Sequence, residues 1–408
     1  MNLYCMKYIK CMLALVCLAS AVHAQKPVAK PIAKPVVNEY AAVDKKALEL
    51  PEAQAGNTTD IAAYINANFI TDKDKTRAIF IWTASNIQYD VENMFAMNFY
   101  EKQDEKIAKA LRNRKGICEN YAAVFNDICA KAGIKSYVIE GYTKQNGFTD
   151  YIPHAWCAAR VDSAWYLFDP TWGSGYISNA KFVKHINNAY CKADPATLIK
   201  SHMPFDPMWE FLQYPVTNQE FYEGKTTPNK TKPVFSYIDS IQVYEQSGHT
   251  EKLQAAARRI EQNGVKNSMI FDRLQHIKME IENDRQAEIV TLFNSASHHY
   301  NDGIASVNDF INYRNKQFTP MKTDPEIQAM LDAPANEFKI ASAKLASIKN
   351  PDANASTSIA QLTKAIDDAS VHLKEQQDWL TTYFGKKKAG RKSMFYEKKY
   401  TWFGVPLN

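Results

Sequence analysis

The chain has 408 residues, 46% of them hydrophobic, so it is long enough for two ordinary domains with real cores. Its formal net charge of +5 is concentrated near the C-terminus, where residues 386–399 hold seven basic residues and one acidic residue. The remainder carries a net charge of about −1, which argues against nucleic-acid binding by the body of the protein.

The first 24 residues are typical of a secretory signal peptide. Lys7 and Lys10 precede an apolar run over residues 11–18. Val22-His23-Ala24 then offers the small residues after which a signal peptidase cuts. We therefore expect the mature chain to begin near residue 25 and to be exported, to the periplasm or the cell exterior.

Two alternatives to cleavage stay open. The apolar run is short for an uncleaved membrane anchor, and a lipoprotein modified at Cys17 would normally have a smaller residue than Val16 before it.

Export permits disulfides, and the sequence leaves open which pairs form. We expect Cys129 and Cys157 to be small buried core residues. The cysteines that remain after cleavage are Cys118, Cys129, Cys157 and Cys191.

Composition divides the chain into six segments. Proline and lysine alternate after the signal peptide, which favours an extended tether. The second boundary is a cluster of proline, asparagine, threonine and lysine that has nothing to bury. The predicted segments are a signal peptide (1–24), a Pro/Lys-rich tether (25–38), a mixed α+β domain (39–224), a linker (225–236), a helical bundle (237–385) and a basic, aromatic tail (386–408).

Three helices are predicted in the first half of the mixed domain. Thr59 and Asp60 are placed to cap the first helix, and the second begins near Thr71 and Asp72. The third begins near Glu119 and ends at a glycine that readily takes the left-handed conformation. Its apolar residues at helical spacing are Tyr121, Val124, Phe125, Ile128 and Cys129, followed by Gly133.

Strands follow these helices. Residues 135–143, 154–161 and 165–169 are rich in β-branched and aromatic residues, and Asp162-Ser163 separates the last two. Helices followed by antiparallel strands indicate an α+β domain. Residues 187–222 are rich in aromatic residues and proline, and we expect them to wrap the domain without regular structure.

The C-terminal half is predicted to be helical. Apolar residues recur every three or four positions over residues 270–311, 325–348 and 356–384. A shorter helix over residues 251–262 opens this region. Short connections between long helices favour antiparallel neighbours, so the apolar stripes are interpreted as intramolecular core rather than as a groove for a partner.

One cysteine, one histidine and one aspartate are candidates for a nucleophilic site. Cys118 follows Gly116 at the start of a predicted helix, where backbone N–H groups favour an anion and lower a thiol pKa. The same N–H groups suit a developing oxyanion, and the sequence assigns no second donor to it. His154 would take the thiol proton, and Asp169 would hold the imidazole in the required tautomer.

The strand register supports a contact between two of these residues. If Asp162-Ser163 is a two-residue turn, Trp156 lies opposite Asp169. His154 is then the diagonal neighbour of Asp169 on the same face, within reach of a hydrogen bond. Cys157 points to the other face. The weak step is the turn, because serine is a poorer turn residue than glycine.

Several motifs in this order resemble the transglutaminase-like superfamily, in its kyphoscoliosis-peptidase-like branch, over about residues 43–221. Cys118, His154 and Asp169 occupy the places of the family's catalytic Cys, His and Asp. The motifs are KTRAIFIW (75–82), NIQYD (86–90), GICENYA (116–122), GI (133–134), HAW (154–156) and WYLFDPTWG (165–173).

The resemblance implies a papain-like transglutaminase core, with helices packed on an antiparallel sheet, followed by the all-α bundle. It also implies acyl transfer on peptide or glutamine amides through a thioester. Trp156 and Trp172 are the predicted substrate-binding residues. Cys157 stands where relatives often carry asparagine, and Ser163 where a turn glycine is common. No acidic loop of the EF-hand type is present, so calcium dependence is not supported.

Other histidines give no metal signal. His298 and His299 face directions about 100° apart on a helix and make a poor metal pair. His185 and His202 lack partners at ligand spacing. We therefore predict no metal and no cofactor.

The tail over residues 386–402 mixes lysines with aromatic residues. It is suited to an anionic envelope surface, and docking of its aromatic residues on the protein itself is the equal alternative.

Two functions from different classes compete. The first is an exported cysteine enzyme acting on a protein or peptide substrate, more of a peptidase or amidase than a cross-linking enzyme. The second is an inactive papain-like binding or scaffold protein that works through its helical region. The sequence leaves open the substrate, the oligomeric state and the choice between hydrolysis and transamidation.

Overall fold

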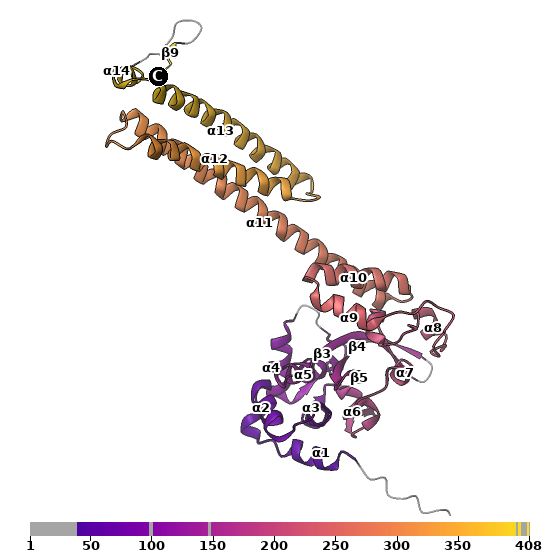
Figure 1. The fold of residues 1–408 in the computed structure, drawn as a ribbon. Coiled ribbons are helices and arrows are strands. Elements are labelled where there is room, and N and C mark those ends of the chain that lie inside the picture. The colour runs from indigo at the N-terminus through magenta and orange to yellow at the C-terminus, as the bar shows by residue number, and fades with distance from the viewer. Residues whose placement is uncertain (1–38, 98–100, 146–147, 397–398, 401–405, 408) are drawn as a thin grey trace, which may run out of the picture.

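The computed structural model describes residues 39–97, 101–145, 148–396, 399–400 and 406–407 (Figure 1). The predicted signal peptide and tether lie outside these residues. An N-terminal α+β part holds one four-stranded antiparallel sheet in the order β5-β4-β3-β8. The strands of this sheet are β3 (Ser136–Gln145), β4 (Phe148–Val161), β5 (Ala164–Phe168) and β8 (His202–Pro204).

Helices precede and follow this sheet. Those before it are α1 (Ala41–Leu48), η1 (Glu52–Gln54), α2 (Thr58–Asn68), α3 (Asp72–Asn86), α4 (Gln103–Asn113) and α5 (Cys118–Lys131). Those within and after it are α6 (Pro170–Ser174), η2 (Asn188–Tyr190), α7 (Pro195–Leu198), η3 (Pro207–Glu210) and α8 (Asn218–Tyr222). Short ladders join β1 (Gln88–Tyr89) to β2 (Lys115–Gly116), β6 (Gly175–Ser178) to β7 (Lys181–Lys184), and β9 (Lys399–Tyr400) to β10 (Pro406–Leu407).

The helix starts follow capping chemistry, with one difference from the prediction. Thr71 caps α3 by accepting a hydrogen bond from the backbone N–H of Asp74, as expected. The cap of α2 is Asn57, whose side chain accepts from Asp60 N–H, so the prediction of Thr59 and Asp60 as caps was wrong. Asparagine is as good a cap as aspartate, and Asn57 stands three residues before Asp60.

Helix α5 is the central helix of the α+β core. The Asn120 side chain accepts from the backbone N–H of Ile117 at 2.9 Å and so fixes the turn that leads into the helix. Gly133 follows the helix with φ +82°, as its residue type predicted. The predicted apolar face is fully buried in the main core at Tyr121, Val124, Phe125, Ile128 and Cys129.

The hairpin between β4 and β5 has the predicted register. Val161 pairs with Ala164, and Cys157 pairs with Phe168. Asp162 takes the left-handed conformation at φ 56°, which aspartate tolerates better than most residues. Ser163 does not have a positive φ, so serine replaces the common glycine at this position of the turn without strain.

Residues 187–222 are more ordered than the sequence suggested. They contain η2, α7, β8, η3 and α8, and β8 extends the sheet beside β3. The close approach depends on Gly141, because a Cβ there would lie 2.1 Å from the carbonyl oxygen of Met203 and 2.6 Å from the Trp156 ring. The expectation of an irregular wrap was wrong, because pairing with β3 satisfies the backbone of this short strand.

The long helices lie close to their predicted positions. The first two of the region, α9 (Tyr237–Gln246) and α10 (His249–Asn263), pack near the sheet. Helix α11 (Ser268–Asn315) then runs away from the α+β part, with α12 (Asp324–Ser347) and α13 (Ala353–Gly385) beside its far half (Figure 1). Helix α14 (Lys388–Ser393) follows at the far end.

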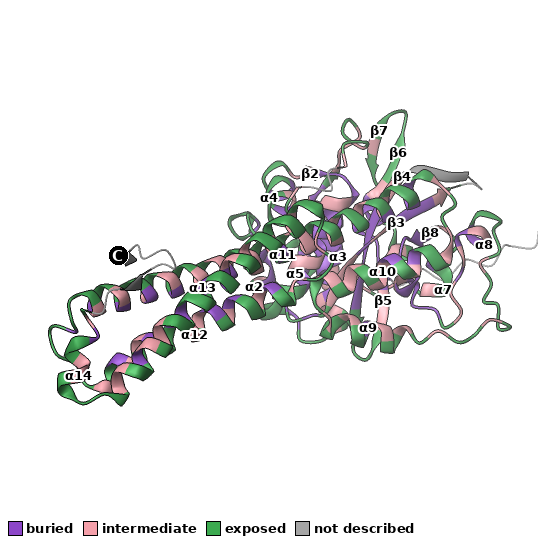
Figure 2. Cartoon of the chain, turned by 90° about the horizontal axis from the view of Figure 1, so that it is seen from above, coloured by how far each residue is buried: buried purple, intermediate pink, exposed green. Residues whose placement is uncertain are grey.

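The arm formed by α11, α12 and α13 has its own core, centred on Phe310, Leu331, Phe338 and Leu380. Buried and exposed positions alternate along α12 and α13 in the manner of amphipathic helices (Figure 2). The base of α11 belongs instead to a core shared with Tyr142 and Met203 of the sheet. The apolar pattern of the long helices thus serves intramolecular packing.

Ion pairs join the helical region to the sheet. Arg259 of α10 donates to both carboxylate oxygens of Asp206 at 2.7 Å, and Arg273 of α11 lies 2.9 Å from Glu140 of β3. In the tail, Arg391 donates to both oxygens of Asp324, and the Phe395 ring packs in the core of the arm. Trp402 lies outside the described residues.

Among the described helices, none combines the length and apolar composition needed to cross a bilayer. The cysteines in the described ranges, Cys118, Cys129, Cys157 and Cys191, are all free and buried.

The contact at Gly141 generates a prediction about stability. Gly141→Ala forces either β8 or Trp156 to move, so the free energy of unfolding should fall by about 1–3 kcal/mol or more. Gly56→Ala is the matched control, because a Cβ at Gly56 meets no atom within 4 Å. Urea denaturation of both variants measures the effect, and equal stabilities would contradict the close packing of β8.

Candidate active site

Cys118 is the first residue of α5. The preceding Ile117 is extended, so the thiol stands at the helix N-terminus, as predicted. The side chain is 4% exposed and contacts the main core. Unpaired N–H groups of a first helical turn stabilise a neighbouring negative charge. This position therefore favours an oxyanion formed next to the thiol.

His154 and Asp169 meet across the β4–β5 hairpin, as the predicted register required. The Nε2 atom of His154 lies 2.8 Å from Oδ2 of Asp169, and the carboxylate is fully buried. The other carboxylate oxygen, Oδ1, accepts from the backbone N–H groups of Thr171 at 2.9 Å and Trp172 at 3.1 Å. Asp169 is thus the N-cap of α6 as well as the partner of His154.

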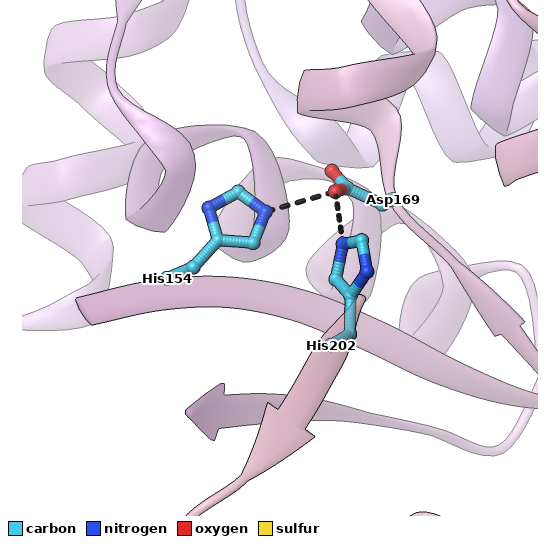
Figure 3. Close-up of side chains that lie close together, drawn as sticks. All are labelled: His154, Asp169 and His202. Carbon is cyan, nitrogen blue, oxygen red and sulfur yellow. Dashed lines mark hydrogen bonds and ion pairs between the residues drawn. The ribbon is translucent and has the colours of Figure 1, made fainter. Parts of the chain in front are cut away.

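His202 is the site residue that the sequence analysis missed. Its Nε2 atom lies 3.0 Å from the same Oδ2 of Asp169, so both imidazoles converge on one oxygen (Figure 3). The sequence analysis found no partner for His202 at ligand spacing, because 33 positions separate it from Asp169 and only the sheet brings them together. The single usable signal was its place in a segment that could add a strand to the sheet.

The buried charges change the pKa of both partners. Burial alone would lower the pKa of His154, but the Asp169 carboxylate and the neighbouring Cys118 thiol outweigh it and raise the pKa to about 10. Burial likewise opposes ionisation of Asp169, yet hydrogen bonds and charge from His154 and His202 hold the pKa of its carboxyl well below the usual range. The pair is therefore an imidazolium and a carboxylate at neutral pH.

The ring orientation decides which nitrogen serves the thiol. Because Nε2 of His154 faces Asp169, Nδ1 is the atom left to exchange a proton with Cys118. Figure 3 shows this second nitrogen on the side of the ring away from the carboxylate. The three side chains thus have the order thiol, imidazole, carboxylate that proton transfer requires.

Trp156 and Trp172 both contact the imidazoles. Trp156 is buried, and its ring stacks on His154 at 6.0 Å between centroids. Trp172 is half-buried and lies 5.7 Å from His154 and 4.6 Å from His202. These rings hold the imidazoles in place, and contact of either tryptophan with a substrate stays a prediction.

Cys157 faces away from the site, as predicted. Its thiol donates to the carbonyl oxygen of Ala122 at 3.3 Å, and burial raises the pKa of this thiol well above its ordinary value. The side chain is therefore part of the core rather than a second nucleophile.

A cavity of about 210 Å³ adjoins His154. Lys106 and Glu119 form an ion pair of 2.7 Å at its wall, and Glu140 lies on the opposite strand. Cys118 and Asp169 do not line it. The lining residues are Met97, Glu101, Gln103, Lys106, Glu119, Ala123, Val138, Glu140, Pro153, His154, Ala155 and Phe205. The cavity offers both apolar and charged surface beside the candidate base.

The site also has the donor types of a metal centre. One nitrogen each from His154 and His202 and a carboxylate oxygen of Asp169 all lie within 4.8 Å of one another, and two imidazoles with one carboxylate suit Zn²⁺ or Fe²⁺. However, the nitrogen–oxygen distances of 2.8 and 3.0 Å are those of N–H···O hydrogen bonds. Protons therefore account for the geometry without an ion.

Comparison with known proteins gives a consistent result. Residues 59–170 match the family model described as the transglutaminase-like superfamily. Kyphoscoliosis peptidase of Mus musculus is 34% identical over 159 residues, covering 37% of this chain and 24% of that protein. Hillarin of Drosophila melanogaster is 27% identical over 203 residues, covering 45% and 24%. The match thus spans about a quarter of the length of these relatives.

A solved structure described as a crystal structure of a TGase is also similar. It shares 20% identity over 39% of this chain and 38% of its own, with a TM-score of 0.23.

The His154–Asp169 pair generates a prediction about pH. Between pH 6.5 and about 10 the folded state holds a proton on His154 that the unfolded state has lost. The stability from this pair is therefore complete below pH 6.5 and disappears as the pH rises through 10. Asp169→Asn keeps the Oδ1 cap of α6 but removes the charge.

The variant should accordingly be less stable than the wild type at pH 6, and the difference should shrink as the pH approaches 10. Urea denaturation across this interval measures both proteins. A difference that stays constant with pH would show that Asp169 does not hold the proton on His154.

Proposed function

Residues 59–170 belong to the transglutaminase-like superfamily, in its kyphoscoliosis-peptidase-like branch, and on that premise we propose that the chain is an exported cysteine enzyme of acyl transfer. The observation that carries the proposal is the buried His154–Asp169 hydrogen bond of 2.8 Å with Cys118 beside it at a helix start. The substrate class is a peptide bond or a glutamine carboxamide in a protein.

The first half of the reaction forms a thioester. In the proposed reactive form the Cys118 thiolate lies beside the His154 imidazolium, and the thiolate attacks the amide carbon. The resulting oxyanion is stabilised by the first-turn N–H groups of α5, including that of Cys118. His154 then donates its Nδ1 proton to the leaving nitrogen, the C–N bond breaks, and an amine or ammonia departs.

The second half releases the acyl group. Water or an amine attacks the thioester while neutral His154 accepts its proton, and the C–S bond breaks to regenerate the thiolate. Throughout both steps Asp169 stays ionised and keeps the ring in one orientation. Water gives a carboxylic acid, whereas an amine gives a new amide.

We place hydrolysis ahead of cross-linking. The reason is that two relatives, from Mus musculus and Homo sapiens, carry the name peptidase. The residues of the site favour neither water nor an amine as the acceptor. Export to the periplasm or exterior is proposed from the N-terminal pattern of residues 1–24. Contact of the lysines of the tail with an anionic envelope surface is a further part of the proposal.

Selective reactivity of one thiol tests the site. At pH 7 iodoacetamide should label Cys118 at least ~10-fold faster than the other cysteines, because thiolate is the reacting form. Burial raises the pKa of Cys129 and Cys157 far above the ordinary value and that of Cys191 to about 11. Mass spectrometry of tryptic peptides measures the rates. Cys191→Ala is the matched control and should label at Cys118 like the wild type.

Labelling of Cys118 no faster than of Cys191 would contradict the enzyme proposal. The remaining function would then be that of an inactive scaffold working through its helical arm, in which Cys118→Ala retains the cellular role.

The nature of the acceptor needs a separate experiment. Wild-type protein should cleave casein into peptides while incorporating little labelled cadaverine, and Cys118→Ala should do neither. Fluorescence of both products in one reaction measures the ratio. Predominant amine incorporation would reverse the order of the two activities and leave the acyl-transfer mechanism intact.

A further inference from the structure

His202 makes a contact that the proposed mechanism does not use. It is 1% exposed and lies 3.0 Å from Oδ2 of Asp169, the oxygen that also meets His154 at 2.8 Å (Figure 3). Any buried polar side chain needs a hydrogen-bond partner. For His202, strand pairing and several surrounding aromatic rings also fix the position of the imidazole. They indicate a role at the site rather than simple satisfaction of a buried ring.

The backbone brings His202 to the site through strand pairing. Residue 202 pairs with Thr143 at the edge of the sheet, two residues from the close contact at Gly141. Aromatic rings then enclose the imidazole. Centroid distances are 4.6 Å to Trp172, 5.2 Å to Trp156 and 5.9 Å to Tyr190. This packing leaves the ring little freedom to turn.

The hydrogen bonds define the direction of donation. Asp169 is ionised and can only accept, so Nε2 of His202 carries the hydrogen of the 3.0 Å bond. The other nitrogen, Nδ1, lies 2.8 Å from the hydroxyl of Ser201. The ring thus donates to Asp169 on one side and has the Ser201 hydroxyl as its partner on the other.

We propose that His202 is a positioning residue for the acyl-transfer site, which donates to Asp169 and thereby sustains the proton on His154 and the thiolate of Cys118. This role rests on the proposed function. With His202, the carboxylate accepts hydrogen bonds from two imidazoles and from the backbone N–H groups of Thr171 and Trp172. Without it, a desolvated anion loses one donor, so it ionises less readily and stabilises the imidazolium less.

The chemical consequence is measurable without a substrate. A less stable imidazolium stabilises a neighbouring thiolate less, and the thiolate is the form that iodoacetamide alkylates. The acidic limb of the alkylation rate against pH therefore moves upward, whereas the plateau at high pH keeps its height. A change in packing alone would lower the plateau or the stability and leave the limb in place.

The experiment uses the full chain and iodoacetamide. His202→Leu removes the donor and keeps an apolar filler, whereas His202→Gln retains an N–H donor at a similar reach. His185→Gln is the matched control, since His185 is exposed and contacts Tyr176 away from the site. Rates of Cys118 alkylation are measured from pH 4 to 9, with circular dichroism and urea denaturation to verify folding.

For His202→Leu we expect the acidic limb of the rate profile to shift to higher pH by about one unit. At a given pH on that limb, Cys118 should then be labelled ~10-fold more slowly. His202→Gln should lie within ~2-fold of the wild type, and His185→Gln should match it. If His202→Leu does not fold, Ser201→Ala takes its place. That variant removes the hydroxyl at Nδ1 and should shift the limb in the same direction by a smaller amount.

Three outcomes would overturn the inference. The first is an acidic limb that does not move in the folded His202→Leu variant, or in Ser201→Ala if that variant replaces it, while Cys118 of the wild type is selectively reactive. This result rejects the role of His202 and leaves the proposed function standing. Absence of selective reactivity in the wild type rejects both. A shift that EDTA produces in the wild type and Zn²⁺ reverses would assign His202 as a metal ligand instead.

Discussion

The structure of the α+β part depends on one buried charge. The Asp169 carboxylate is fully inaccessible and yet ionised, which would cost several kcal/mol if the charge were left unpaired. Four N–H groups, from His154, His202, Thr171 and Trp172, compensate it. The donors come from β4, β8 and α6, so a single side chain ties a central strand, an edge strand and a short helix together.

This dependence explains residue choices that have no chemistry of their own. Pro170 opens α6 where its missing N–H costs nothing. Gly173 lets α6 approach α3, since a Cβ there would lie 2.3 Å from the Phe80 ring. Gly141 likewise lets β8 approach β3 closely, since a Cβ there would lie 2.1 Å from the carbonyl oxygen of Met203. Each small residue permits the close packing that delivers a donor to Asp169.

The helical arm is tied to this domain but packs around a separate centre. Its far half is held by Phe310, Phe338 and their neighbours, whereas the base of α11 shares a core with Met203, the residue after His202. Arg273 of α11 also pairs with Glu140 at the wall of the cavity. The base of the arm thus supports the sheet from which the site is built.

The sequence by itself determined the elements and most of the site. Helical periodicity located α5 and the long helices, and the two-residue separation of β4 and β5 correctly paired Val161 with Ala164. That register brought His154 to Asp169, because contacts within a hairpin are local and follow from alternation alone. The motif around Cys118 placed the thiol at a helix start for the same local reason.

Only the tertiary structure decided the rest. His202 lies in a three-residue strand whose pairing with β3 crosses about sixty positions of chain, and so short a strand has no periodicity to detect. Asn57 caps α2, and sequence alone could not select it because the nearby Thr59 and Asp60 are also residue types that cap helices. A local pattern can place a side chain on its own element, but its neighbours on distant elements are set by packing of the whole domain.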